Sequence, residues 1–335
     1  MGQTEEALIT RIQRLFPSFK EGIGIGDDAA IVEARGEIVI TTDMLLEGID
    51  FTLDIPMGFI GAKALTANIS DLAAMGAIPK NFLLTLAMPP DSAASIDPLL
   101  YGLRDAASKY EVKLIGGDLS SGPCLIISIT AIGAMDGARP LLRSGAQAGD
   151  RLYVSRPLGA SATGLHLTQS GWKVTAEGNA VSPSGYALSY TQREFAASVL
   201  RRHVSPEAEV ALGRKLATAG LASSCIDVSD GLSTDLQHLC RASRCGARIQ
   251  WDRLPVFPDL PQLARPIGIS VDEVVLHGGE EYSLLFTSPL RESELSQRLS
   301  RPVYQIGTIV KGSELTIVRD EKEEPLEVRG YDHFA

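Results

Sequence analysis

The chain has 335 residues, of which 44% are hydrophobic and 21% are charged, with 32 glycines and 18 prolines. This is the composition of an ordinary globular protein, and the length predicts two domains of roughly 150 residues each. The 31 basic and 41 acidic residues give a formal net charge of -10 without a basic stripe, which argues against a nucleic-acid partner. No apolar run reaches the roughly 18 residues that a membrane span requires, so we expect no membrane role.

The first part of the chain alternates helical and strand-like patterns. We expect helices at 4–16, 61–75 and 97–110, and strands at 37–42, 82–88 and 124–132. A turn-rich stretch from Gly133 to Gly149 then indicates a domain boundary. We therefore divide the chain into an N-terminal domain at 1–138 and a C-terminal domain at 139–335.

The second part continues the same mixed α/β pattern. A strand is expected at 151–155, and a polar, mobile loop around 172–188. The remaining expected elements are helices at 189–202, at 206–219 and from 231, and strands at 224–228, 282–287, 303–310 and 315–319.

Aspartates fall at the expected ends of strands and at loop edges. Asp43 closes the run IVITT, Asp118 follows VKLIGG, and Asp227 and Asp230 lie at the end of CIDVSD. Asp28 follows the glycine-rich segment GIGIG. In open α/β sheets, ligands gather at the ends of strands, so these carboxylates are expected to share one cleft.

A sixth aspartate, Asp71, lies inside a helical pattern, on the face opposite Leu65, Ile69 and Leu72. Carboxylate oxygens without converging His or Cys favour magnesium or calcium over zinc, iron or copper. Magnesium commonly binds through one or two carboxylates and the phosphates of a substrate, so several aspartates predict several ions shared with a polyphosphate. The chain has neither a P-loop nor the HRD and DFG motifs of protein kinases.

No residue pattern predicts a catalytic acid or base. The five histidines have no readable partners, and we expect most of them to be surface or capping residues. If the acceptor is a phosphate monoester, whose second pKa is about 6, it is already ionised at neutral pH and needs no general base. The four cysteines form no CxxC pair and no signal peptide is visible, so reduced thiols in the cytoplasm are expected.

Eight segments, in order from residue 24 to the C-terminus, resemble the thiamine-monophosphate kinase family. They are GIGDDAAI at 24–31, TTDMLLEGIDF at 41–51, KALTANISDLAAMGAIPK at 63–80, GGD at 116–118, LLRSGAQAGD at 141–150, IDVSDGLSTDL at 226–236, HGGEEYSLLF at 277–286 and GYDHF at 330–334. The resemblance implies an aminoimidazole-ribonucleotide synthetase-like fold with two α/β domains, the N-terminal sheet packing across a homodimer interface. The implied reaction is magnesium-dependent transfer of the γ-phosphoryl group of ATP to thiamine monophosphate.

The resemblance also implies roles for individual positions. Those implied to bind or support several magnesium ions are Asp28, Thr41, Thr42, Asp43, Asp71, Asp118, Asp227 and Asp230. Those implied for ATP are Gly117, Asp118, Arg143, Ser229 and Tyr101. Asp50, Glu280 and Tyr331 are implied to border the thiamine.

The chain departs from the family pattern at several positions. Asp50 stands where the family usually has His, and Ser121 in GGDLSSG stands where the family often has an Arg after GGDTT. The family segment GGEDYEL is GGEEYSL in this chain, with Glu281 and Ser283. The departures at Asp50 and Ser121 leave open a nucleotide-binding regulator with weakened catalysis. A separate alternative is another ATP-dependent enzyme of the superfamily.

Overall fold

The computed structural model describes residues 5–16, 19–20, 22, 24–25, 29–30, 32–34, 36–183, 189–258 and 260–331. The chain divides into two compact units, which are described separately. Unit 1 contains 1–72, 77–137 and 174–177, and unit 2 contains 73–76, 138–173 and 178–335. No helix in the described part of the chain is long and apolar enough to cross a membrane.

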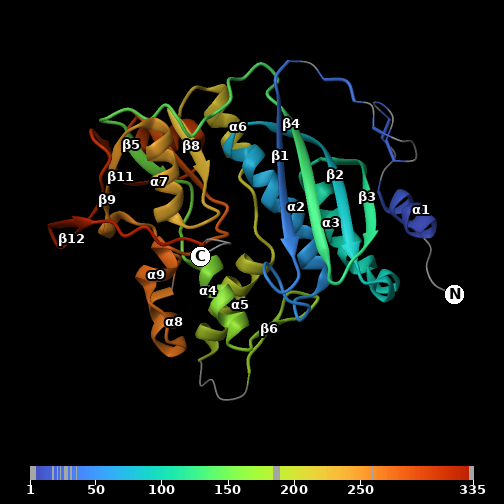
Figure 1. Ribbon diagram of the computed structural model, residues 1–335. Helices are drawn as coiled ribbons and strands as arrows, with labels where there is room; N and C mark the ends of the chain where they lie inside the picture. Colours follow the sequence, from blue (N-terminus) through green and yellow to red (C-terminus); the bar gives the residue numbers. More distant parts are fainter. Residues whose placement is uncertain are drawn as a thin grey trace. The chain divides into compact units, whose positions relative to one another are not determined.

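Unit 1 is built on a four-stranded mixed sheet with the order β1-β4-β2-β3. Figure 1 shows helices α2 and α3 on one face of this sheet. The strands are β1 (Ile38–Leu46), β2 (Ile78–Met88), β3 (Lys113–Ser121) and β4 (Ile126–Ala134). The helices are α1 (Glu5–Leu15), α2 (Met57–Ala74), the 3-10 helix η1 (Pro90–Ser95) and α3 (Asp97–Lys109).

The two faces of this sheet differ in burial because successive side chains of a strand point to opposite sides. Leu84 and Leu86 of β2 and Ile129 of β4 are at most 4% exposed and lie on the helix-covered face. On the opposite face, which we call the open face, Ile38, Ile40 and Met44 of β1 are 46%, 58% and 58% exposed. The sheet of unit 1 therefore has one buried face and one partly apolar face that remains exposed in the single chain.

Unit 2 contains a seven-stranded mixed sheet with the order β13-β12-β9-β11-β5-β10-β8. Its strands are β5 (Arg151–Val154), β8 (Ser224–Asp227), β9 (Gly246–Gln250), β10 (Leu284–Ser288), β11 (Tyr304–Val310), β12 (Leu315–Arg319) and β13 (Lys322–Pro325). The short strands β6 (Lys173–Val174) and β7 (Ala180–Val181) pair in a separate two-stranded sheet.

The helices of unit 2 bury the central strands of the large sheet. The rings of Tyr153 and Phe286 stack at 5.4 Å between centroids, within a core that also contains Leu216 of α6 and Leu295 of α10. The helices are α4 (Ala160–Gln169), α5 (Tyr190–Val204), α6 (Val210–Thr218), α7 (Leu232–Ser243), η2 (Trp251–Arg253), α8 (Leu260–Ile267), α9 (Val271–Leu276) and α10 (Glu292–Leu299).

Most of the expected elements are present, with two corrections that affect the site. Strand β1 runs to Leu46, so Asp43 lies inside the strand and does not close it. Strand β3 includes Asp118, which the sequence placed after the strand. The strand pairing continues through both residues, because Asp43 pairs with Ile129 of β4 and Asp118 pairs with Thr85 of β2. Residues 184–188 of the expected mobile loop lie outside the described residues.

Candidate functional site

Five of the predicted site residues meet in unit 2, although they come from three distant segments. The turn 228–231 connects β8 to α7 and follows Asp227, the last residue of β8. The backbone N–H of Glu280 donates to the carbonyl of Ser229 at 2.7 Å, and the N–H of Tyr331 donates to the carbonyl of Asp230 at 3.2 Å. Backbone hydrogen bonds thus bring the turns at 228–231 and 277–283 and the segment 330–331 to one place.

A buried carboxyl group that the sequence did not reveal shapes the first of these turns. Asp235 on α7 is 1% exposed, and its Oδ2 accepts from the backbone N–H groups of Ser229, Asp230 and Gly231 at 3.1 Å each. Burial, and then the neighbouring carboxylates of Asp227 and Asp230, raises the pKa of Asp235 to about 8. The motif IDVSDGLSTDL contains Asp235, but the sequence does not show that its side chain folds back onto the 228–231 turn.

Glu280 occupies a strained turn and is held by a buried histidine. Its backbone has φ +58° and that of Tyr282 has φ +48°, a region that residues other than glycine rarely adopt. Nδ1 of His203 lies 3.3 Å from Glu280 Oε2, and the His203 side chain is 3% exposed. His203, which belongs to α5, is thus an exception to the expectation that most histidines lie at the surface or cap helices.

The neighbouring residue, Glu281, anchors the turn to α4. Its Oε1 accepts from the backbone N–H groups of Gly159 and Ser161 at 2.9 Å each, at the beginning of that helix. Burial raises the pKa of Glu281 to about 7, against the opposing effects of these two hydrogen bonds and the nearby Arg156 guanidinium. Glu281 is thus a buried cap of α4 that fixes the position of the 277–283 turn.

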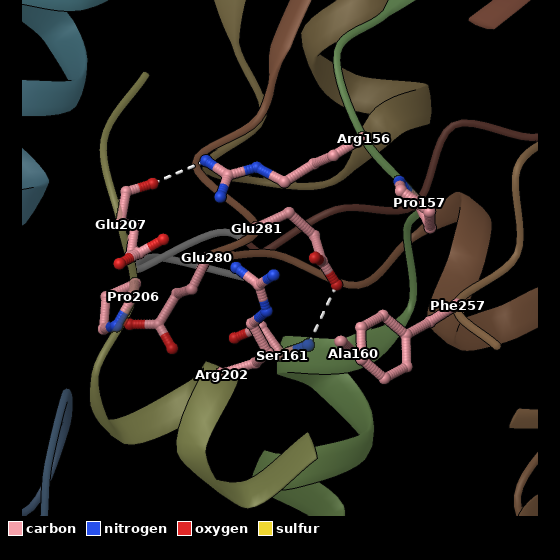
Figure 2. A pocket seen from close by; sticks show the side chains of 10 residues that line it. All are labelled: Arg156, Pro157, Ala160, Ser161, Arg202, Pro206, Glu207, Phe257, Glu280 and Glu281. Carbon is pink, nitrogen blue, oxygen red and sulfur yellow. Dashed lines mark hydrogen bonds between the residues drawn. The ribbon is translucent and has the colours of Figure 1, made fainter. Parts of the chain in front are cut away.

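A small pocket lies beside these two glutamates, entirely within unit 2 (Figure 2). Its empty space, counted together with the open solvent at its mouth, is about 270 Å³, and the side chains of Arg202, Phe257 and Glu280 line it. Arg156 at its edge donates to the carbonyls of Glu207 and Tyr282. The pocket therefore combines an aromatic wall with charged groups of both signs.

The segment that carries Tyr331 approaches the turn so closely that only glycine fits before it. A Cβ on Gly330 would lie 2.1 Å from Thr234 Oγ1 and 2.7 Å from the carbonyl oxygen of Asp230. Tyr331 itself is 53% exposed. Gly330 thus lets the backbone at 330–331 lie against the 228–231 turn, with the exposed Tyr331 beside it.

Arg143 lies on an exposed loop that is hydrogen-bonded to the same part of unit 2. The carbonyl of Arg143 accepts from Ser243 Oγ at 2.9 Å, and the carbonyl of Leu142 accepts from the N–H of Cys225 at 2.8 Å. Cys225 belongs to β8, the strand that ends at Asp227. The loop is therefore attached to the strand that leads into the 228–231 turn.

In unit 1, a second group of predicted residues meets between β1 and α2. The hydroxyl of Thr41 donates to Asp71 Oδ2 at 2.5 Å, and the backbone N–H of Asp43 donates to Asn68 Oδ1 at 3.0 Å. Asn68 is fully buried, and its Nδ2 donates to the carbonyl of Ala64 at 3.1 Å. Thr41, Asp43 and Asp71 thus lie on the helix-covered side of β1, with Asn68 fixing the strand to the helix.

Asp118 lies on the other face of the same sheet. In the strand register, Asp118 pairs with Thr85, Thr85 with Ser128, and Ser128 with Met44, which belongs to the open face. Asp43 pairs with the buried Ile129 instead. Within one chain, the register therefore does not bring Asp118 together with Asp43 and Asp71. Gly117 precedes Asp118 in β3. A Cβ at Gly117 would lie 1.8 Å from the carbonyl oxygen of Leu84, so this position requires glycine.

The remaining predicted residues have separate positions. Thr42 lies on the open face, where its hydroxyl donates to the carbonyl of Ile129 at 3.0 Å. Asp50 closes the turn after β1, because its Oδ2 accepts from the N–H of Leu46 at 2.8 Å. Tyr101 on α3 is 42% exposed, with the Arg104 guanidinium 5.3 Å from its ring centroid. Asp28 lies outside the described residues.

In the part of the chain that the structure describes, the oxygen-rich side chains form no preassembled metal cage. Among the residues that the structure describes, no three His, Cys, Asp or Glu side chains form a group that could hold a metal ion. A magnesium ion requires only one or two carboxylates when substrate phosphates and waters complete its shell. The carboxylates of Asp43 and Asp71 in unit 1, and of Asp227 and Asp230 in unit 2, have the chemistry for such partial ligation.

Known proteins resemble this chain over both of its parts. The models of the N-terminal and C-terminal domains of AIR synthase related proteins match residues 26–135 and 147–320. The chain is 36% identical over 320 residues to the thiamine-monophosphate kinase of Escherichia coli K12, covering 93% of this chain and 92% of that relative. The crystal structure of thiamine-monophosphate kinase from Stenotrophomonas maltophilia K279a has a TM-score of 0.78 and 34% identity, covering 95% of this chain and 97% of that chain.

A second solved structure, AaThiL complexed with AMPPCP and TMP, has a TM-score of 0.76 and 30% identity, covering 98% of this chain and 97% of that chain. The matches to the two domain models and to the thiamine-monophosphate kinases extend over most of the chain. This chain therefore belongs to the AIR synthase related family and, within it, to the thiamine-monophosphate kinases.

Proposed function

We propose that this protein transfers the γ-phosphoryl group of ATP to thiamine monophosphate and releases thiamine diphosphate and ADP. An oxygen of the acceptor phosphate attacks the γ-phosphorus, and the bond between that phosphorus and the oxygen bridging it to the β-phosphate breaks. The observation that carries the proposal is the junction of three segments at Asp230, which places carboxylates beside an exposed tyrosine. The complex of AaThiL with AMPPCP and TMP supports the same pair of reactants.

The reaction needs positioning and charge neutralisation more than proton transfer. The acceptor phosphate is largely ionised at neutral pH, since its second pKa is about 6, so no side chain has to remove a proton from it. His203 and His277 of unit 2 are instead hydrogen-bonded or ion-paired inside the fold. We assign neither histidine a role as catalytic acid or base.

Magnesium, when bound, supplies positive charge that offsets the phosphate oxygens of both reactants. The residues that would hold or support it are Asp28, Thr41, Thr42, Asp43, Asp71, Asp118, Asp227 and Asp230. Their donors are all hard oxygens, which is the ligand chemistry that magnesium prefers. For ATP we assign Gly117, Asp118, Arg143, Ser229 and Tyr101.

The organic part of the acceptor is assigned to Glu280 and Tyr331, with Asp50 as a further contact. Thiamine carries a cationic ring, which a carboxylate and an aromatic face both attract. His203 restrains the Glu280 carboxylate, so the side chain is held in place before the acceptor binds. This preorganisation lowers the entropy that binding would otherwise lose.

We further propose that the protein is a homodimer that works in the cytoplasm. The open face of unit 1 exposes Ile38, Ile40 and Met44, and covering these side chains with a second copy would remove apolar surface from water. The four free cysteines support a reducing compartment.

The activity is tested by incubating the protein with ATP, magnesium and thiamine monophosphate, and measuring thiamine diphosphate as its fluorescent thiochrome derivative after chromatography. Unphosphorylated thiamine serves as the control acceptor, and it should react far more slowly because its hydroxyl requires a general base. Absence of thiamine diphosphate while ATP still binds would favour a regulator. Use of another acceptor in place of thiamine monophosphate would favour a different enzyme of the superfamily.

A further inference from the structure

The turn between β8 and α7 has the location of a phosphate site but lacks the free backbone groups of one. A turn that leads from a strand into a helix usually presents unpaired N–H groups, which together with the helix dipole bind anions. Here the N–H groups of Ser229, Asp230 and Gly231 all donate to one atom, Oδ2 of Asp235. The buried carboxyl group of Asp235 therefore occupies these three donors.

This arrangement is more than an ordinary helix cap. The cap side chain of a helix usually comes from the residue just before the helix and reaches forward into the first turn. Asp235 is the fourth residue of α7 and reaches backward to three successive residues that precede the helix. It therefore fixes the shape of the turn itself, in addition to the start of the helix.

With these donors occupied, the turn offers a ligand mainly oxygen acceptors. The carbonyls of Ser229 and Asp230 accept from the N–H groups of Glu280 and Tyr331. The acidic side chains that remain here are Asp230 in the turn and the buried Asp227 at the end of β8. A phosphate alone would be repelled by these carboxylates, whereas a divalent cation would be attracted and could carry a phosphate with it.

We propose that Asp235 is a positioning residue that makes this turn a cation-binding turn and prevents it from acting as an anion-binding one. By holding three successive N–H groups, it directs the turn so that Asp227 and Asp230 ligate the magnesium that accompanies the nucleotide. The inference rests on the proposed function, because it requires Asp227 and Asp230 to be magnesium ligands.

The experiment compares three variants with the parent protein. Asp235→Ala removes the acceptor, and Asp235→Asn keeps one oxygen acceptor with nearly the same shape. Ser189→Ala is the structural control, because Ser189 caps α5 by accepting from the N–H of Gln192 and belongs to no proposed site. The readouts are the magnesium concentration for half-maximal activity, kcat and KM for ATP, and the affinity for Mn²⁺ measured by electron paramagnetic resonance with AMPPCP present.

Asp235→Ala is expected to raise the half-saturating magnesium concentration and to weaken Mn²⁺ binding by roughly tenfold or more, the scale of lost orienting contacts around a metal. Asp235→Asn should show smaller changes than Asp235→Ala in both the half-saturating magnesium concentration and the Mn²⁺ affinity. It is the variant that tests the inference if Asp235→Ala does not fold. Ser189→Ala should lower thermal stability without changing either metal readout. Parent-like metal dependence in Asp235→Asn and Asp235→Ala, with only stability lowered, would overturn the inference.

A fourth variant separates this outcome from failure of the proposed function. Asp230→Asn removes a proposed ligand directly, so it should weaken metal binding at least as much as Asp235→Ala. If Asp230→Asn changes the metal dependence and the Asp235 variants do not, only the positioning role is lost. If Asp230→Asn has no effect on Mn²⁺ binding, the magnesium assignment fails, and the inference fails with it.

Discussion

Asn68 Oδ1 accepts the backbone N–H of Asp43 at 3.0 Å, which links the middle of β1 to α2 at the predicted metal side of unit 1. Asn68 is fully buried, so removing its side chain leaves the Asp43 N–H without this partner. We expect Asn68→Ala to destabilise the fold by about 1–3 kcal/mol. It should also raise the magnesium concentration needed for half-maximal activity, because Asp43 loses its fixed position.

Thr66→Ala is the matched control for this prediction. Thr66 lies on the same helix and is 3% exposed, but its hydroxyl donates within the helix to Ala62. Chemical denaturation and a magnesium titration distinguish the two variants. An unchanged magnesium requirement in Asn68→Ala, at any loss of stability, would contradict the predicted role.

Asp71→Asn should abolish turnover while preserving the fold. The amide can still accept from the Thr41 hydroxyl, but it cannot supply a negative charge to a metal. We expect kcat to fall by roughly 100-fold or more, with thermal stability in the absence of magnesium equal to the parent's or slightly higher. The control is Asp105→Asn, since Asp105 is an exposed residue of α3 that pairs with Arg104. Near-normal turnover in Asp71→Asn would defeat the assignment.

The buried carboxyl of Glu281 should make the stability depend on pH. Its pKa is raised from 4.5 to about 7, so the folded protein binds more protons than the unfolded chain between these values, and stability falls as pH rises through this window. Glu281→Gln keeps an oxygen acceptor for Gly159 and Ser161 without the charge. Its Tm relative to the parent should therefore rise between about pH 4.5 and 7 and stay constant above that range, as measured by calorimetry. A difference in Tm that does not vary with pH would show that the buried carboxyl does not titrate in this window.

Gly330→Ala should disturb acceptor binding more than ATP binding. The added Cβ would overlap Thr234 Oγ1 and the carbonyl oxygen of Asp230, so the segment carrying Tyr331 must move away from the turn. We expect KM for thiamine monophosphate to rise by about tenfold, with a smaller change in KM for ATP. Gly58→Ala is the control, because the nearest atom to its Cβ would be 3.5 Å away, an ordinary contact. Equal changes in both KM values would argue that the segment acts only through the fold.

The exposed residues of the open face provide a test of the homodimer. Ile40→Arg places a charge in the middle of this face and should shift the protein from dimer to monomer in analytical ultracentrifugation, since burying an unpaired charge is costly. Ile49→Arg is the matched control, because Ile49 is also 58% exposed but lies in the turn after β1. A parent protein that sediments as a monomer would refute the homodimer directly.

The sequence by itself predicted the mixed α/β class, most helices and strands, and the segments that carry the site, because periodicity and strand-end aspartates are local properties of the chain. It did not reveal Asp235, His203 or Asn68, whose partners lie on other segments or depend on a turn folding back. It also placed Asp43 and Asp118 in equivalent settings, whereas the strand register puts them on opposite faces of one sheet. Only tertiary structure decides these points, because burial, register and hydrogen bonds between distant segments arise when the elements pack together.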